Sequence, residues 1–238
     1  MSIFSQTKIL RSTGFLNGRT DFHSHVLPGV DDGIRKIEDS LRALKTFEEA
    51  GLRELWLTPH IMEDVPNTPE HLRDVFASLS EAYTGPIKLH LAAENMLDSL
   101  FEKRLKSGIL LPIGKGQDHL LVETSYFNPP SNFDSLLAEI NSAGLYILLA
   151  HPERYIYMDK DDYKSLIDRG VKFQINYGSL TGFYGDTAKK KAEWLLKEGY
   201  VTVFGSDMHR NSALARQLDG KTSAKAVDRL IALPEPEF

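Results

Sequence analysis

Seven short β-rich segments alternate with longer helical segments, and few folds contain this alternation of elements. The predicted strands are residues 19–25, 53–60, 87–94, 119–124, 146–152, 172–176 and 201–207. This alternation is typical of repeated βα units arranged around a parallel sheet. The sequence therefore predicts an α/β protein in which consecutive strands run in the same direction.

The helices between these strands are predicted from apolar spacing and from the residues that end them. In residues 37–50, apolar side chains recur every three positions on one helical face, and Gly51 follows where a positive φ is favourable. Similar patterns predict helices over 69–83, 133–143, 160–169 and 187–198. Residues 212–238 predict one further helix followed by a proline-containing tail.

Length and composition predict one domain. The 238 residues fit the size of a single α/β barrel, 42% of them are apolar, and no Ser-, Gly- or Pro-rich linker divides them. We expect a single domain over residues 1–238, with residues 1–18 as an N-terminal extension.

Charge and hydropathy narrow the classes of function. With 33 acidic against 28 basic residues, the net charge of −5 disfavours a general nucleic-acid binder or a nuclease. The longest apolar stretch, residues 145–150, is far shorter than the roughly 20 residues that cross a bilayer, and the N-terminus lacks a signal-type apolar core. We therefore expect a cytoplasmic protein without membrane insertion. The absence of cysteine excludes disulfides, zinc–thiolate sites and a cysteine nucleophile.

Side chains that commonly bind metals stand at the ends of six of the seven predicted strands. They are His23, His25, His60, Glu94, Glu123, His151, Asp207 and His209. The loops that follow parallel strands open on one face, so we expect these side chains to converge. The i, i+2 spacing of His23 with His25 and of Asp207 with His209 places each pair on one side of an extended segment. The pattern predicts a metal site at the carboxyl ends of the strands.

The remaining histidines and one acidic loop need separate interpretation. His71, His90 and His119 fall in a helix, in the middle of a strand and at the start of a strand, so we interpret them as structural. The loop 28–33 contains Asp32 followed by glycine, which alone indicates an Asp-Gly turn. Beside the His23–Ser24–His25 motif, Asp32 becomes a candidate ligand.

The motifs at these positions resemble a known superfamily. Residues 21–33 read DFHSHVLPGVDDG, and they are followed by TPH (58–60), AEN (93–95), LVE (121–123), AHPERY (150–155) and GSDMH (205–209). This set is similar to the PHP (polymerase and histidinol phosphatase) superfamily, and within it to the bacterial manganese-dependent protein tyrosine phosphatases of capsule and exopolysaccharide operons. The resemblance implies a distorted (β/α)7 TIM-like barrel.

The resemblance also implies roles for individual residues. It implies three divalent metal ions, one held by His23, His25, Glu94 and Asp207, a second by the bridging Glu94 with Glu123 and His151, and a third by Asp32, His60 and His209. Arg154 matches an arginine that contacts phosphate. A second such arginine is expected a few residues after His209, where either Arg210 or Arg216 could serve, and we favour Arg210.

The donor set and the resemblance together suggest a reaction. Imidazole and carboxylate ligands suit manganese, iron or zinc, and we favour manganese. The resemblance implies hydrolysis of protein phosphotyrosine by a metal-activated water, with the tail of a bacterial tyrosine kinase of polysaccharide export as substrate. A small-molecule phosphatase of histidinol-phosphate type and a non-catalytic, metal-stabilised interaction module are the alternatives.

Three further features border the predicted site. Asp21 and Asn176 could orient ligands or substrate, or could only make ordinary hydrogen bonds at strand ends. The loop 177–185 is rich in glycine and aromatic residues, which could surround an aromatic leaving group or pack on the rim of the fold.

Overall fold

The computed structural model describes residues 6–236 and 238 of the chain. Nine strands make up its two main sheets: β2 (Thr20–Asp21), β3 (Glu54–Leu57), β4 (His60–Ile61), β5 (Lys88–Leu91), β6 (Glu94–Met96), β7 (His119–Glu123), β8 (Tyr146–Ala150), β9 (Lys172–Asn176) and β10 (Val201–Gly205). The strand order is β10-β9-β8-β7-β6-β4 in one sheet and β2-β3-β5 in the other, and every neighbouring pair is parallel. The predicted parallel α/β architecture is confirmed.

All seven predicted strand segments are found, two of them interrupted. Segment 53–60 forms β3 and β4, and segment 87–94 forms β5 and β6, so each contributes to both sheets. The edge strands β2 and β10 of the two sheets are also connected. The Phe22 amide, directly after β2, donates to the Phe204 carbonyl of β10 at 3.1 Å. Two sheets rather than one continuous sheet are present, and a closed seven-stranded barrel is not established by them.

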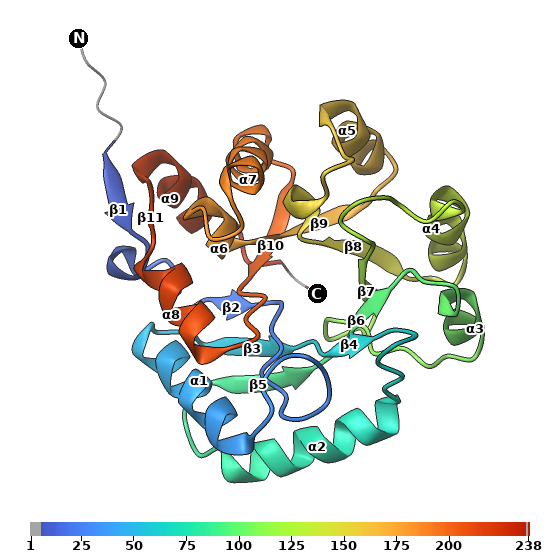
Figure 1. Ribbon diagram of the computed structural model, residues 1–238, viewed down its shortest axis with the longest axis horizontal. Helices are drawn as coiled ribbons and strands as arrows, with labels where there is room; N and C mark the ends of the chain where they lie inside the picture. Colours follow the sequence, from blue (N-terminus) through green and yellow to red (C-terminus); the bar gives the residue numbers. More distant parts are fainter. Residues whose placement is uncertain (1–5, 237) are drawn as a thin grey trace.

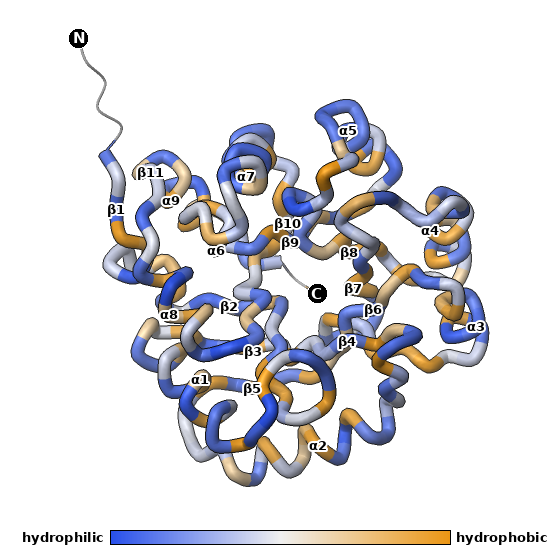
Figure 2. The backbone as a smooth tube through the Cα atoms, in the orientation of Figure 1, coloured by the Kyte–Doolittle hydropathy of each residue, from blue (hydrophilic) through white to orange (hydrophobic). Residues whose placement is uncertain are grey.

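Helices surround the strands on the outside of the molecule (Figure 1). They are α1 (Ile37–Glu49), α2 (Pro69–Ala82), α3 (Phe101–Lys106), α4 (Phe133–Ser142), α5 (Lys160–Asp168), α6 (Tyr177–Leu180), α7 (Asp186–Glu198), α8 (Asn211–Asp219) and α9 (Ala224–Ile231). Hydrophilic and hydrophobic stretches alternate along peripheral helices such as α2 (Figure 2). On α1 the apolar face predicted from spacing is buried, with Leu44 and Phe47 fully inside the core. Within residues 6–236 and 238, no helix has the length and apolar character needed to cross a membrane.

The C-terminal part of the chain differs from the sequence expectation. Residues 212–238 form two helices, α8 and α9, rather than one helix and a tail, because strand β11 (Lys221–Ser223) separates them. Strand β11 pairs antiparallel with β1 (Thr7–Ile9). Of the predicted N-terminal extension 1–18, residues 1–5 lie outside the described residues. Leu10, Phe15 and Leu16 are buried in the main core, so the rest of this segment is packed against the fold.

Strands β2 and β10 approach each other closely at the position where the site begins. A Cβ on Gly205 would lie 2.5 Å from the Cβ of His23, so no larger residue fits there without displacing His23. The Asp21 carboxylate fastens the same junction, because it accepts hydrogen bonds from the backbone amides of both His23 and Ser206 at 3.0 Å. The first and last strands of the main sheets are therefore joined directly beneath the predicted ligands.

Candidate metal centre

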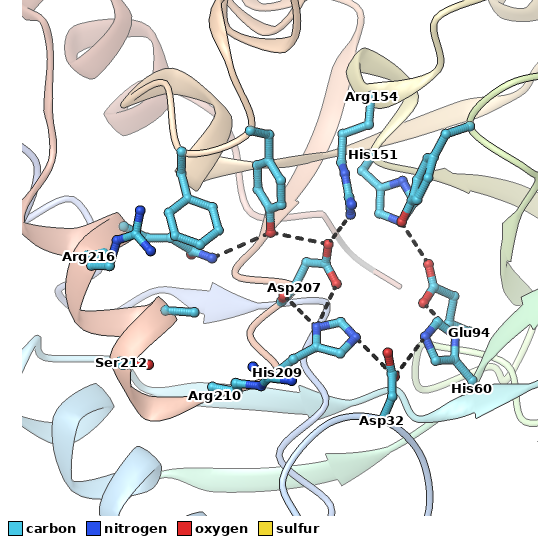
Figure 3. Close-up of a pocket in the computed structure, with 15 residues that line it drawn as sticks. Asp32, His60, Glu94, His151, Arg154, Asp207, His209, Arg210, Ser212 and Arg216 are labelled. Atoms are coloured by element: carbon cyan, nitrogen blue, oxygen red, sulfur yellow. Dashed lines mark hydrogen bonds and ion pairs between the residues drawn. The ribbon is translucent and has the colours of Figure 1, made fainter.

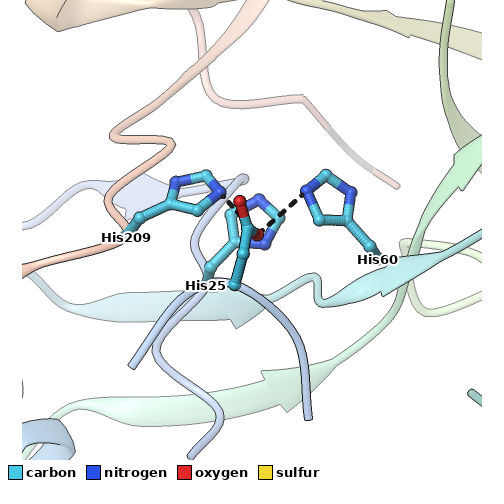
Figure 4. Close-up of side chains that lie close together, drawn as sticks. His25, His60 and His209 are labelled. Carbon is cyan, nitrogen blue, oxygen red and sulfur yellow. Dashed lines mark ion pairs between the residues drawn. The ribbon is translucent and has the colours of Figure 1, made fainter. Parts of the chain in front are cut away.

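The nine predicted ligands converge at the carboxyl ends of the strands, as the sequence predicts. Their donor atoms form four overlapping groups, in each of which the atoms lie within 4.8 Å of one another. The groups are His25, Asp32, His60 and His209; His23, His25 and Asp207; His23, Glu94 and His151; and His60, Glu94 and Glu123. Figure 4 shows His25, His60 and His209 gathered around one point. Chain segments up to 186 residues apart in sequence thus build one polar cluster.

Glu94 lies at the centre of this cluster. Its Oε2 is 3.2 Å from His23 Nε2, 3.3 Å from His25 Nε2 and 3.1 Å from His60 Nδ1. Its Oε1 is 3.0 Å from His151 Nε2. The residue is fully buried. The two carboxylate oxygens of Glu94 therefore face two different parts of the cluster.

Hydrogen bonds fix how two of the imidazoles are oriented. His23 Nδ1 donates to Gln174 Oε1 at 2.8 Å, and His25 Nδ1 donates to Asp31 Oδ2 at 2.8 Å. In the neutral rings the two Nε2 atoms therefore carry lone pairs, although they lie only 3.1 Å apart. Two lone pairs at that distance repel unless a proton or a cation lies beside them. This arrangement suits histidines that bind metal through Nε2.

Four buried polar atoms of the cluster have no hydrogen-bond partner. They are His60 Nδ1, Glu94 Oε2, Glu123 Oε1 and His151 Nδ1. Buried polar groups are nearly always paired, and the three of these atoms that face the centre of the cluster are donors of the kind that coordinate divalent cations. The residues present therefore fit a metal centre.

The electrostatics of the cluster also favour cations. Burial alone would raise the pKa of Asp207, but the neighbouring His25 imidazole and the charges of His23 and Arg154 hold it well below the usual range. Burial would lower the pKa of His23, but the charges of Glu94 and Asp207 outweigh this effect and raise it to about 9. The pKa values of Glu94 and Asp32 are lowered as well, mainly by neighbouring histidines, so these three carboxylates remain ionised and draw positive charge to the site.

Arg154, the predicted phosphate contact, lies in the wall of the pocket above this cluster. Its Nη1 is 2.6 Å from Asp207 Oδ2 (Figure 3). Its guanidinium carbon is 4.3 Å from the ring centres of both Tyr126 and Tyr184, which enclose it by cation–π contact. The charge of Arg154 is therefore held in a fixed place beside the ligands.

The two candidates for a second arginine both line this pocket. Arg210 is exposed and directly follows His209. The guanidinium carbon of Arg216, from α8, lies 5.1 Å from the ring centre of Phe183. Lining the pocket therefore does not distinguish Arg210 from Arg216. The phosphate contact of Arg210 stays a prediction.

Two buried residues that contact the predicted ligands, Asp31 and Gln174, are not predicted from the sequence. Asp31 is the buried acid of the Asp31–Asp32 pair, and it also accepts a hydrogen bond from the His60 amide at 3.1 Å, whereas the side chain of Asp32 is 72% exposed. Gln174 joins His23 to Asn176, whose Nδ2 donates to Asp207 Oδ2 at 2.7 Å. The sequence signal for Gln174 is a glutamine in the middle of the predicted strand 172–176.

The remaining expectations about the surroundings of the site are resolved by these contacts. Asn176 orients a predicted ligand directly, and Asp21 fixes the backbone of two ligand segments. The segment 177–185 is not a loop throughout, because Tyr177–Leu180 form α6. It combines both interpretations, since Tyr177 and Leu180 are buried in the core while Phe183 and Tyr184 line the pocket.

The fold and the cluster together define an α/β protein with a parallel sheet and a buried His/Asp/Glu site able to hold metal. Residues 19–231 match the family described as capsular polysaccharide synthesis, CpsB/CapC, and the chain belongs to that family.

Named relatives align with most of this chain. The chain is 27% identical over 195 residues to the tyrosine-protein phosphatase YwqE of Bacillus subtilis, and the alignment covers 79% of this chain and 76% of YwqE. It is 29% identical over 208 residues to the tyrosine-protein phosphatase CpsB of Streptococcus pneumoniae, covering 79% and 82%. Crystal structures of YwqE and CpsB are described as unique metal-dependent tyrosine phosphatases. One of these structures matches with a TM-score of 0.75 and 25% identity, covering 82% of this chain and 81% of the other.

Proposed function

We propose that this protein is a metal-dependent protein-tyrosine phosphatase. The observation that carries the proposal is the convergence of nine imidazole and carboxylate ligands beside Arg154, at the base of a pocket with aromatic walls. Relatives named as tyrosine-protein phosphatases support the same activity. The chain contains no cysteine, so a cysteinyl-phosphate route is not available to it.

We assign three ions to the cluster, with manganese as the favoured metal. The first set is His23, His25, Glu94 and Asp207, the second is Glu94, Glu123 and His151, and the third is Asp32, His60 and His209. The central place of Glu94 supports its role as a bridge, because its two oxygens face different histidines. His60 Nδ1 also lies 3.1 Å from Glu123 Oε1, so the second and third sets adjoin each other.

The side chains around the ions would divide the work of binding and orientation. Bound divalent ions would supply Lewis-acid stabilisation of phosphoryl oxygens and a water of lowered pKa. Arg154 would donate to the phosphate oxygens, and the tyrosines on either side keep its guanidinium from swinging away. Phe183 and Tyr184 offer apolar surface to the phenyl ring that carries the phosphate.

Several finer features belong to the same proposal. Hydrogen bonds between the segments that follow β2 and β10, including the Asp207 amide to the His23 carbonyl at 2.8 Å, support a barrel closed by seven strand segments within one domain. We place the protein in the cytoplasm, where the phosphorylated tail of a bacterial tyrosine kinase of capsule or exopolysaccharide synthesis would be its substrate. The family match to capsular polysaccharide synthesis supports this partner.

The test measures metal content and phosphotyrosine hydrolysis on one preparation. Purified protein is stripped with a chelator, dialysed and reloaded with Mn²⁺, Fe²⁺ or Zn²⁺, and the bound metal per chain is measured beside turnover of a phosphotyrosine peptide and of histidinol phosphate. We expect close to three ions per chain and clear preference for the peptide. Full metal loading without hydrolysis of either compound would contradict the proposal.

A further inference from the structure

Two exposed apolar side chains lie on neighbouring loops beside the metal centre. Phe127 and Ile156 have relative exposures of 66% and 63%, the highest of the large apolar residues in the described part of the chain. Phe127 follows β7, and Ile156 follows the short 3-10 helix after β8. The Ile156 amide donates to the Tyr126 carbonyl at 2.9 Å, which holds the two loops together. Phe127 and Ile156 are therefore exposed on loops that a hydrogen bond holds in place.

These side chains line a second groove that shares a wall with the metal pocket. Tyr126, Arg154 and Tyr184 line both hollows. We call the second one the flank groove, formed by Tyr126, Phe127, Ile156 and Tyr184. A phosphate bound at Arg154 would place its carrier beside this shared wall. Consecutive residues of an extended chain are about 3.5 Å apart, so residues next to a bound phosphotyrosine come within reach of the flank groove.

The charged groups near the flank groove are already engaged. Lys191 Nζ donates to the carbonyls of Tyr155 at 2.5 Å and Met158 at 2.8 Å. Glu153 is buried, and its Oε1 accepts from Ser179 Oγ and the Asn176 amide. Arg154 Nη1 is likewise directed to Asp207 Oδ2, so the polar atoms of these three charged side chains point to protein partners and not into the groove. The surface that remains is aromatic and aliphatic.

We propose that the flank groove binds a large apolar side chain adjacent to the phosphotyrosine of the substrate. The inference rests on the proposed function and adds a sequence preference to it. Contact with Phe127 and Ile156 removes apolar surface of both partners from water, which stabilises the bound peptide. A small aryl phosphate has no flanking residue and gains nothing from this groove.

The test compares two phosphotyrosine peptides that differ only beside the tyrosine. One carries leucine on both sides and the other glycine. With the wild-type, Mn²⁺-loaded protein we expect kcat/KM for the leucine peptide to be about 10-fold higher, as one buried apolar side chain allows. In the double variant Phe127→Ser, Ile156→Ser this preference should disappear, while turnover of p-nitrophenyl phosphate stays at the wild-type level.

A matched control and a second readout separate this inference from the proposed function. Ile231→Ser removes an apolar side chain with 47% exposure on α9, and it should leave the peptide preference intact. Peptides with a non-hydrolysable phosphonate in place of the phosphate, measured by fluorescence anisotropy, report the preference even without turnover. Absent hydrolysis with a preserved binding preference would contradict the phosphatase and support the groove.

Two outcomes would overturn the inference. One is equal kcat/KM and equal binding for both peptides in the wild-type protein. The other is a double variant that keeps the preference but changes the molecular mass measured by light scattering, which would assign Phe127 and Ile156 to contact between copies of the chain.

Discussion

Asp31 Oδ2 lies 2.8 Å from Nδ1 of His25, and both side chains are completely buried. The carboxylate fixes the ring orientation and turns Nε2 toward Glu94 and Asp207. Carboxylates in this position increase the basicity of an imidazole that binds metal. Asp31 thereby orients a predicted ligand, although Asp31 itself is not one of the predicted ligands.

The first prediction concerns this contact. Asp31→Asn should weaken the binding of Mn²⁺ by about 10–100-fold, because the amide orients His25 without its negative charge. Equilibrium dialysis with metal analysis measures the change. Asp64→Asn, at an exposed position, is the control with wild-type affinity. An unchanged affinity for Mn²⁺ in Asp31→Asn would show that Asp31 does not support metal binding.

The second prediction concerns Arg154. Arg154→Ala should lower kcat/KM for a phosphotyrosine peptide by about 100-fold, since a fixed donor to the phosphoryl group is lost. Arg154→Lys should recover only part of this loss, because the ammonium cannot donate two parallel hydrogen bonds. Inhibition by inorganic phosphate should weaken in the same order. Equal inhibition constants for inorganic phosphate in wild type, Arg154→Ala and Arg154→Lys would show that phosphate does not bind at Arg154.

The third prediction separates Arg210 from Arg216. Arg216 is already engaged with the ring of Phe183, whereas Arg210 borders both His209 and the pocket. We expect Arg210→Ala to raise KM for the phosphotyrosine peptide more than Arg216→Ala does, as measured by steady-state kinetics. The reverse order would give the phosphate contact to Arg216.

The fourth prediction concerns metal removal. A chelator should abolish turnover and Mn²⁺ should restore it, while iodoacetamide has no effect because no thiol is present. For each ion site, reloading at 100 times the dissociation constant of that site should add about 2.7 kcal/mol to the free energy of unfolding. Thermal melting with and without Mn²⁺ measures this gain. Melting temperatures that do not depend on Mn²⁺ would contradict a built metal site.

The fifth prediction concerns pH and His119, which lies away from the metal centre. His119 Nδ1 lies 2.7 Å from Asp118 Oδ1, and Nε2 lies 2.5 Å from Lys172 Nζ. Burial lowers the pKa of His119 below 6.5, the charge of Lys172 adds to this effect, and the contact with Asp118 opposes it. The unfolded chain therefore binds the proton more readily than the folded one, so stability is present above pH 6.5 and is lost as the pH falls below it.

The experiment compares wild type with His119→Gln, whose amide does not titrate in this range. Between pH 7.5 and 5.5 the free energy of unfolding should fall more in the wild type than in the variant. Denaturant unfolding at both pH values measures the difference, and the metal centre contributes equally to both proteins. Parallel losses would assign the pH dependence to other groups.

The sequence predicts much of the fold because most strands and helices of the two main sheets carry a local signal. The apolar face of α1 and the ligands at strand ends are of this kind, and all nine predicted ligands converge. Contacts between distant segments have no local signal. The pairing of β1 with β11 and the division of residues 212–238 into α8 and α9 depend on such contacts.

The same reason explains what is missed in the site. Asp31 and Asp32 are adjacent and chemically alike, and only the packing of His25 decides which of them is buried. Tyr126 lies in a loop whose sequence gives no sign that its ring will contact Arg154. Histidines stand out in a sequence because they are rare. The residues that orient them by hydrogen bonds, such as Asp31 and Gln174, are of types common throughout the chain.

The junction fastened by Asp21 has a consequence for how the protein is made in the cell. It joins a strand near the start of the chain to Ser206, and Asp207 and His209 follow directly. Translation releases His23, His25 and His60 from the ribosome long before these two residues. Under the proposed assignment of ligands, tight metal binding would wait until Asp207 and His209 have been released, because metal binding is coupled to folding. Loading with metal would then be a late step of biosynthesis, and an unfinished chain would hold its early histidines without a complete set of the proposed ligands.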